Sequence, residues 1–86
     1  MTYTLSKQYL WKEIGNQVVI LHFESGRYFS LNASGSLIWK AVLENLPQDR
    51  IVDRLCAEFD VDRDTARQDT EHMVCSFVDR NFLIQS

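Results

Sequence analysis

The stretch QVVILHFESGRYFSLN, residues 17–32, decides the fold. Its first part, Gln17–Phe23, is rich in β-branched and aromatic side chains, and this composition predicts a strand. Glu24, Ser25 and Gly26 follow as a tight turn, in which Gly26 supplies a positive φ angle. Arg27–Leu31 then returns as a second strand. The stretch is therefore predicted to form a β-hairpin.

A further strand is expected before this hairpin. Tyr9–Ile14 is a short mixed run of apolar and polar residues. It ends at Gly15-Asn16, a pair suited to a two-residue hairpin turn. The three strands together predict an antiparallel meander in which Arg27–Leu31 lies at an edge.

Helices are predicted after the strands. Ala33–Asn45 carries apolar residues at helical spacing and can be capped by Asn32 or Ser34. Pro47 interrupts this pattern and opens a second helix over Gln48–Phe59.

The third helix is predicted to begin at a cap on Asp62 and to end near Arg80. Asn81 suits the left-handed position that follows a helix. The fold class expected for residues 1–86 is a single α+β domain of the winged helix-turn-helix type. It has a three-stranded antiparallel sheet followed by three helices.

The strand Gln17–Phe23 is apolar on both of its sides. Side chains alternate across a strand, so one side carries Val19, Leu21 and Phe23, and the other carries Val18, Ile20 and His22. One face exceeds what a single core requires, which leaves open a homodimer through the sheet.

Composition excludes several classes of protein. Nine basic and twelve acidic residues give a net charge of −3, which disfavours binding to phosphates. Cys56 and Cys75 lack metal-ligand spacing and are expected to be small buried side chains rather than a disulfide. The longest apolar run, Val18–Leu21, is far too short for a membrane span, and no secretory signal is visible. A cytoplasmic protein is expected.

Residues spread over the hairpin, the first and third helices and the C-terminal end resemble one known family. They are Ser25–Asn32, Gly35, Ile38-Trp39, Asp69-Thr70, Met73-Val74, Phe77 and Asn81-Phe82-Leu83. On these residues the chain resembles the pyrroloquinoline quinone biosynthesis protein D (PqqD) family, from about Gly15 to Ile84. Family members usually have glycine in place of Asn81 and an aliphatic residue in place of Thr70, departures that leave the expected fold unchanged.

The resemblance implies a recognition domain with no chemistry of its own and no metal or cofactor. Such proteins bind the N-terminal leader of a ribosomally made precursor peptide and hand it to a processing enzyme. The length and the GRYFSLNASG stretch are most similar to the stand-alone leader-binding proteins of lasso peptide clusters, whose partner is a cysteine-protease-like leader peptidase. The alternative within the family is PqqD proper, the peptide chaperone of a radical SAM enzyme in pyrroloquinoline quinone biosynthesis.

The resemblance also implies where the leader binds, as a strand beside Arg27–Leu31 and in a groove against the third helix. An edge strand has unpaired N–H and C=O groups that a guest strand can satisfy. The expected peptide-binding residues are Arg27, Tyr28, Phe29, Ser30 and Leu31 on the strand, and Asp69, Thr70, Met73, Val74 and Phe77 on the helix. Val74 and Phe77 also fit the core, Met73 fits either role, and Arg27 also fits a solvated turn.

A winged helix that binds DNA is the main alternative from another class. Its third helix would need a basic surface. Between Asp62 and Arg80 the chain has three basic residues against five acidic ones, so phosphate would be repelled. A structural subunit also stays open. An enzyme is not expected, because no nucleophile and base, paired carboxylates or phosphate-binding loop can be assembled.

Overall fold

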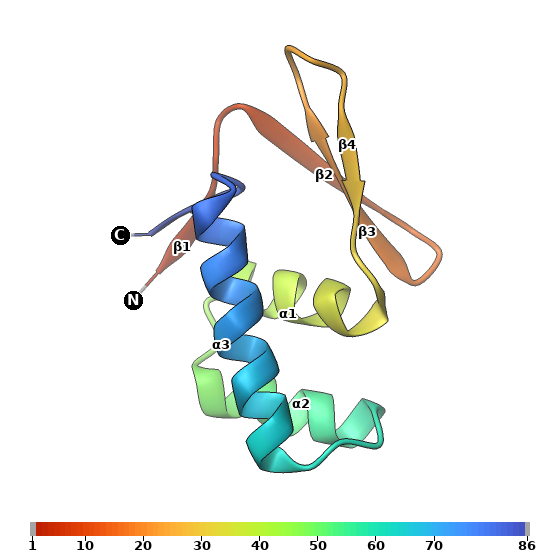
Figure 1. Cartoon of the computed structure of the whole chain (residues 1–86), viewed down its shortest axis with the longest axis vertical. Coiled ribbons are helices and arrows are strands. Elements are labelled where there is room, and N and C mark those ends of the chain that lie inside the picture. Colours follow the sequence, from red (N-terminus) through yellow and green to blue (C-terminus); the bar gives the residue numbers. More distant parts are fainter. Residues whose placement is uncertain (1, 86) are drawn as a thin grey trace.

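The computed structural model describes residues 2–85 and contains two small sheets and three helices (Figure 1). The elements are β1 (Tyr3–Leu5), β2 (Tyr9–Ile14), β3 (Gln17–His22), β4 (Tyr28–Ser30), α1 (Ala33–Leu43), α2 (Gln48–Glu58), α3 (Arg63–Asp79) and β5 (Leu83–Gln85). Strands β2, β3 and β4 form an antiparallel sheet in that order, and β4 is its edge. This confirms the predicted α+β fold and the predicted place of the third strand of the meander.

The predicted elements differ from the observed ones only at their ends. β3 ends at His22 rather than Phe23, and β4 is shorter than predicted, although hydrogen bonds to β3 continue on either side of it. α1 ends at Leu43 because Asn45 adopts a left-handed φ of 61°. α2 ends at Glu58, one residue before the predicted end.

Local signals in the sequence account for these boundaries. The Asn32 side chain accepts a hydrogen bond from the Gly35 N–H at 2.8 Å, so Asn32 rather than Ser34 caps α1. The Asp62 carboxylate accepts one from the Thr65 N–H at 2.8 Å at the start of α3. Gly26 at a φ of 71° and Asn81 at a φ of 63° hold the predicted left-handed positions.

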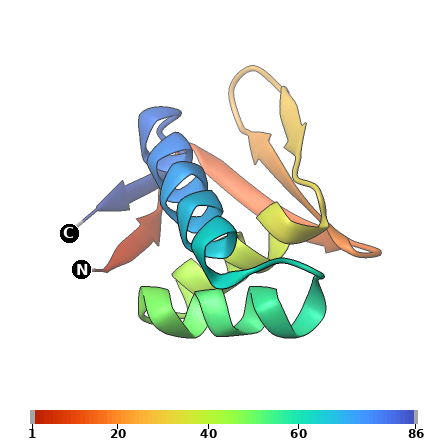
Figure 2. The same ribbon diagram turned by 60° about the horizontal axis from the view of Figure 1, so that its bottom comes forward.

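The second sheet was not predicted. β1 and β5 pair antiparallel, with Tyr3 opposite Gln85 and Leu5 opposite Leu83. The pairing continues as the Ser6 N–H donates to the Phe82 carbonyl at 3.0 Å. This sheet brings the two ends of the described chain together, on the side away from β4 (Figures 1 and 2).

Trp39 of α1 lies at the centre of the core and is fully buried. Its ring makes edge contacts with Trp11 on β2, Phe77 on α3 and Phe82, at centroid distances of 6.3, 5.0 and 6.4 Å. The indole Nε1 has no hydrogen-bond partner within residues 2–85, so the side chain contributes by packing rather than by a polar contact. Trp39 therefore anchors α1 to both the sheet and α3.

The two faces of the larger sheet differ in burial. Val18 and Ile20 are fully buried on the face that packs against the helices. No helix of the described chain covers the opposite face. In Figure 2 the helices lie on one side of this sheet only. Its exposed large apolar side chains are Leu10, Ile14, Phe23 and Tyr28.

Candidate functional site

At the open edge of the sheet, two residues of β4, Tyr28 and Ser30, have backbone groups that are free to bind a further strand. The Leu31 N–H donates to the Val18 carbonyl at 2.9 Å, and the His22 N–H donates to the Arg27 carbonyl at 2.8 Å. Hydrogen-bonded pairs alternate along an antiparallel ladder, so positions 27, 29 and 31 direct their backbone groups toward β3. Tyr28 and Ser30 lie between them and therefore direct their N–H and C=O groups away from the sheet.

Ser36 holds the end of this edge and was not singled out in the sequence. Its buried hydroxyl accepts a hydrogen bond from the Val18 N–H at 2.8 Å and donates to the Leu31 carbonyl at 3.2 Å. The hydroxyl thus links two backbone groups that would otherwise face each other as the last pair of the ladder. It ties β3, the end of β4 and the first turn of α1 into one unit.

Helix α3 runs in the opposite direction to β4 (Figure 1), and two of its side chains approach the two ends of that strand. The Arg80 guanidinium carbon lies 5.9 Å from the centre of the Phe29 ring. Met73, seven residues before Arg80, reaches the start of α1 at Gly35. A Cβ placed on Gly35 would lie 3.3 Å from the Met73 Cε and 3.6 Å from the Leu31 Cβ, so both side chains border the same spot. One end of β4 therefore faces Arg80 and the other faces Met73.

The helix residues predicted to bind peptide divide into three groups. Phe77 is buried in the core against Trp39. Thr70 is also buried, and its hydroxyl donates to the Ala66 carbonyl at 2.8 Å. Asp69 is exposed, while Met73 and Val74 are half-buried on different sides of the helix.

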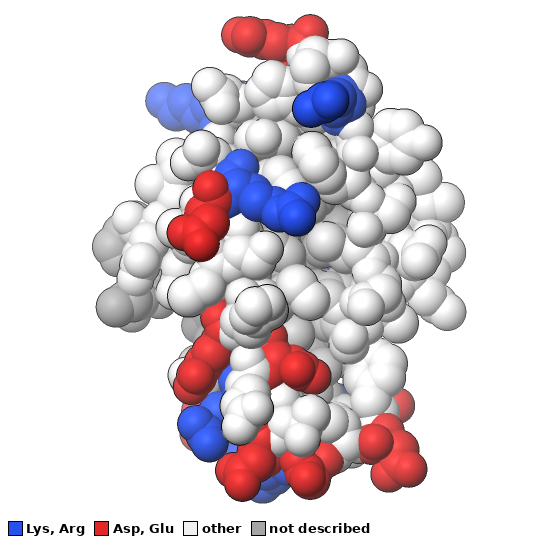
Figure 3. Space-filling model, in the orientation of Figure 1, with Lys and Arg blue, Asp and Glu red and all other residues white. Residues whose placement is uncertain are grey.

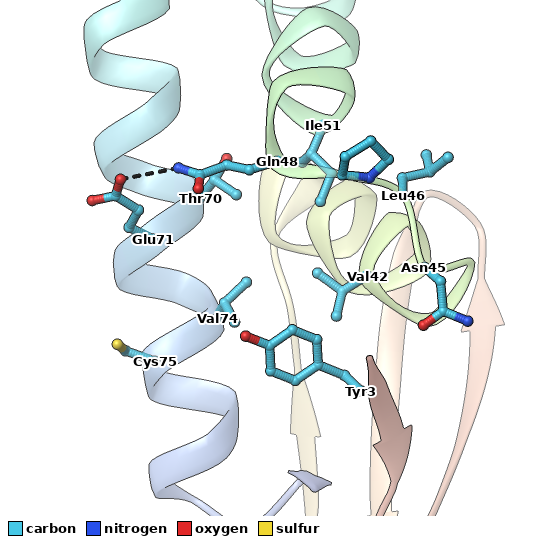
Figure 4. A pocket seen from close by; sticks show the side chains of 11 residues that line it. Tyr3, Val42, Asn45, Leu46, Gln48, Ile51, Thr70, Glu71, Val74 and Cys75 are labelled. Atoms are coloured by element: carbon cyan, nitrogen blue, oxygen red, sulfur yellow. Dashed lines mark hydrogen bonds between the residues drawn. The ribbon is translucent and has the colours of Figure 1, made fainter. Parts of the chain in front are cut away.

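Val74 and Thr70 line a cavity of about 480 Å³ on the flank of α3 that faces away from β4. Figure 4 shows Tyr3 from β1 pointing into this cavity and the Gln48 side chain bonded to Glu71 across it, at 3.0 Å. The structure thus brings Met73 to the strand, but not Thr70 or Val74. Cys75 lies at the cavity and is exposed, contrary to the expectation of a buried thiol.

Charge is distributed unevenly over α3. Near its N-terminus Arg63 pairs with Asp53 at 2.6 Å, and Arg67 pairs with Asp64 and Glu71 at 3.4 and 3.7 Å. Asp53 raises the pKa of the Arg63 guanidinium by hydrogen bonding and charge attraction. Figure 3 shows acidic side chains gathered over α2 and this half of α3, and basic atoms on an otherwise uncharged surface between the C-terminal end of α3 and the hairpin. Arg63 and Arg67 are thus paired with acidic side chains, whereas a DNA-binding helix would direct its basic side chains at phosphates.

Other kinds of site find little support. Within residues 2–85, no group of three or more His, Cys, Asp or Glu side chains could hold a metal ion. None of the helices in this range is long and apolar enough to cross a membrane.

Comparison with known proteins gives one family and two similar structures. The model of the family described as coenzyme PQQ synthesis protein D matches residues 17–83. The structure of TbiB1 in complex with the TbiA(beta) leader peptide is 34% identical in sequence, with a TM-score of 0.82 over 100% of this chain and 98% of that one. A lasso peptide synthetase B1 complexed with the leader peptide has a TM-score of 0.87 over 99% of this chain and 100% of that one, and at 22% identity it supports the fold. No curated protein matches the sequence.

Proposed function

Because the chain belongs to the PqqD family, whose model covers residues 17–83, we propose that it binds the leader segment of a ribosomally made precursor peptide. In this proposal the leader adds as a strand to the free edge of β4, and alternate side chains lie against α3. The observation that carries the proposal is the outward direction of the Tyr28 and Ser30 backbone groups, with Met73 beside the strand. Backbone hydrogen bonds supply affinity, and side-chain contacts supply selectivity.

The processing enzyme that we propose as the partner is a lasso peptide leader peptidase, to which the chain delivers the bound leader in the cytoplasm. Identity of 34% over the whole chain to TbiB1, a protein solved with a leader peptide, supports leader binding, and the chain length and the GRYFSLNASG stretch favour this partner. The alternative is delivery to a radical SAM enzyme, as the family's description by PQQ synthesis suggests. Neighbouring genes distinguish the two: a leader peptidase with an asparagine-synthetase-like cyclase supports the first, and a radical enzyme supports the second. We propose no catalytic role for the chain itself.

Titration calorimetry with the leader encoded beside this gene tests the binding directly. We expect saturable binding of the leader and none of the core peptide that follows it. The absence of measurable heat at tens of micromolar leader would contradict the proposal.

Proline replacement tests the strand addition itself. Ser30→Pro removes an N–H that points away from β3, and edge strands tolerate proline. We expect a loss of leader affinity of tenfold or more, about 1.4 kcal/mol, with the fold retained by circular dichroism. Ser30→Ala keeps the N–H and is the matched control, for which affinity should be unchanged. If Ser30→Pro binds the leader like the wild type, the leader does not add at β4.

A homodimer through the uncovered sheet face is a separate proposal, supported by the exposed apolar side chains on that face. Light scattering of the protein with and without leader tests it. A monomeric mass in both states would contradict it without affecting leader binding.

A further inference from the structure

The space between β4 and α3 is bounded by two different pairs of side chains. Phe29 and Arg80 stand at one end, and Leu31 and Met73 stand at the other. Phe29 and Leu31 are two residues apart on a strand, which separates them by about 7 Å. Arg80 and Met73 are seven residues apart on a helix, about 10 Å. The strand and the helix therefore present two successive subsites rather than one continuous apolar wall.

A strand added to β4 would match this spacing. Its side chains alternate between the two faces, so residues i and i+2 both face α3 with the same separation as Phe29 and Leu31. If the guest continues the antiparallel order of the sheet, its residue i lies near Met73 and its residue i+2 lies near Arg80. The first subsite is apolar, and methionine adapts readily to different apolar side chains.

The second subsite contains an uncommitted cation. The arginines at the other end of α3, Arg63 and Arg67, are both in ion pairs. Within residues 2–85 no acidic side chain pairs with Arg80, whose guanidinium lies over the Phe29 ring. Arg27 precedes β4, alternates to the same side as Phe29, and likewise has no acidic partner in the described part of the chain. A guanidinium has five N–H donors in a geometry that matches a carboxylate.

Building on the proposed function, we infer that Arg80 is a specificity-determining residue that selects a carboxylate in the leader. The preferred leader carries an apolar side chain at position i, against Met73 and Leu31, and Asp or Glu at position i+2, against Arg80. Arg27 adds positive charge to the same end. The reversed placement of such a peptide is disfavoured, because a carboxylate beside Met73 would lie one helical turn from the exposed Asp69 rather than beside Arg80.

A displayed library of random twelve-residue peptides, selected separately on three forms of the protein, tests this inference. The forms are the wild type, Arg80→Glu and Arg50→Glu. Arg50 is an exposed arginine of α2 without an ion pair in the described chain. Arg50→Glu therefore makes the same change of charge as Arg80→Glu, but at a place away from β4. We expect an apolar-x-acidic pattern in the wild-type and Arg50→Glu pools, and Lys or Arg in place of the acid in the Arg80→Glu pool.

Quantitative binding of one selected peptide completes the test. Replacing its acid by the corresponding amide should weaken binding to the wild type roughly three- to tenfold and leave binding to Arg80→Gln nearly unchanged. Peptide pools without an acidic preference, or pools that Arg80→Glu does not alter, would overturn the inference while leaving leader binding intact. Failure of the wild type to enrich any peptide would instead overturn the proposed function, and the inference with it. Arg80→Gln keeps the test valid if Arg80→Glu is poorly folded.

Discussion

The two flanks of α3 differ in what lies beside them and are suited to different tasks. The flank toward β4 has Met73 and Arg80 beside a strand with unpaired backbone groups. The other flank has Val74 and Thr70 beside a cavity that α2 and β1 close on two further sides. A cavity offers volume, whereas a strand edge offers a row of directional hydrogen bonds. A cavity therefore need not be a better site for an extended peptide than a free strand edge.

The largest expected effect is on stability, at Phe77, which lies on α3 between the two flanks. Phe77 is 2% exposed and packs at 5.0 Å on Trp39, so Phe77→Ala should leave a cavity in the core. We expect a loss of about 3–5 kcal/mol in the free energy of unfolding, measured by denaturant titration. A loss below about 1 kcal/mol would mean that Phe77 faces a guest rather than the core.

A smaller loss is expected where the edge is anchored. Ser36→Ala removes the hydroxyl that joins the Val18 N–H to the Leu31 carbonyl. Leaving these backbone groups without a partner should cost about 2–3 kcal/mol in unfolding free energy. Leader affinity should also fall, because the end of β4 loses its tie to α1. Ser34→Ala, an exchange of the same kind at a less buried serine, serves as the control and should have little effect on either quantity.

The comparison of flanks is tested most directly by a matched pair of half-buried residues. Met73→Ala should weaken leader binding about tenfold, or about 1.4 kcal/mol, because it removes a side chain beside β4. Val74→Ala should leave leader affinity within about twofold, since Val74 lines the cavity on the other flank. Calorimetry on both variants decides between the flanks. The reverse ranking would place the leader in the cavity.

Both flanks depend on the N-terminal cap of α3, where the smallest effect is expected. Hydrogen bonds from the Thr65 backbone and hydroxyl lower the pKa of the Asp62 carboxyl below its usual range. A lowered folded-state pKa means that the cap stabilises the protein above the unfolded pKa of about 3.9. That contribution is lost as pH falls through the lower folded-state pKa.

Thermal unfolding of Asp62→Ala and the wild type between pH 2 and 7 measures this contribution. The midpoint of the variant should be lower near neutral pH, and the difference should vanish in acid. Asp60→Ala removes a nearby exposed acid that is not a cap and should show no such convergence. A difference between Asp62→Ala and the wild type that persists at the lowest pH would contradict the ionic origin of the effect.

The parts of the fold that could be predicted depend on signals close together in the sequence. Gly26, Asn32 and Asp62 each mark a boundary through their own backbone or side chain, so the main sheet and the helices followed. The pairing of β1 with β5 could not be predicted, because three-residue strands have no readable period and their partners lie at opposite ends of the chain. Sequence periodicity reports the local structure of a segment and says little about which distant segments come into contact.

The candidate site shows the same limit. Helical spacing alone puts Thr70, Met73 and Val74 on one broad side of α3, whereas the structure places Met73 beside β4 and Thr70 and Val74 on the other flank. An apolar stripe is wide enough to face two neighbours. Only the packing of β4 on one side and of β1 and α2 on the other separates these residues. Arg80 was absent from the predicted site because its partner, Phe29, is more than half the chain away.

The pairing of β1 with β5 has a practical consequence. Tyr3 lies opposite Gln85, so the two ends of the described residues lie together on the side away from β4 (Figure 1). A linker, a tag or a whole enzyme attached at either end would start from that side and leave the free edge of β4 uncovered. Under the proposed function, an enzyme fused at either end would meet the bound leader at a high local concentration.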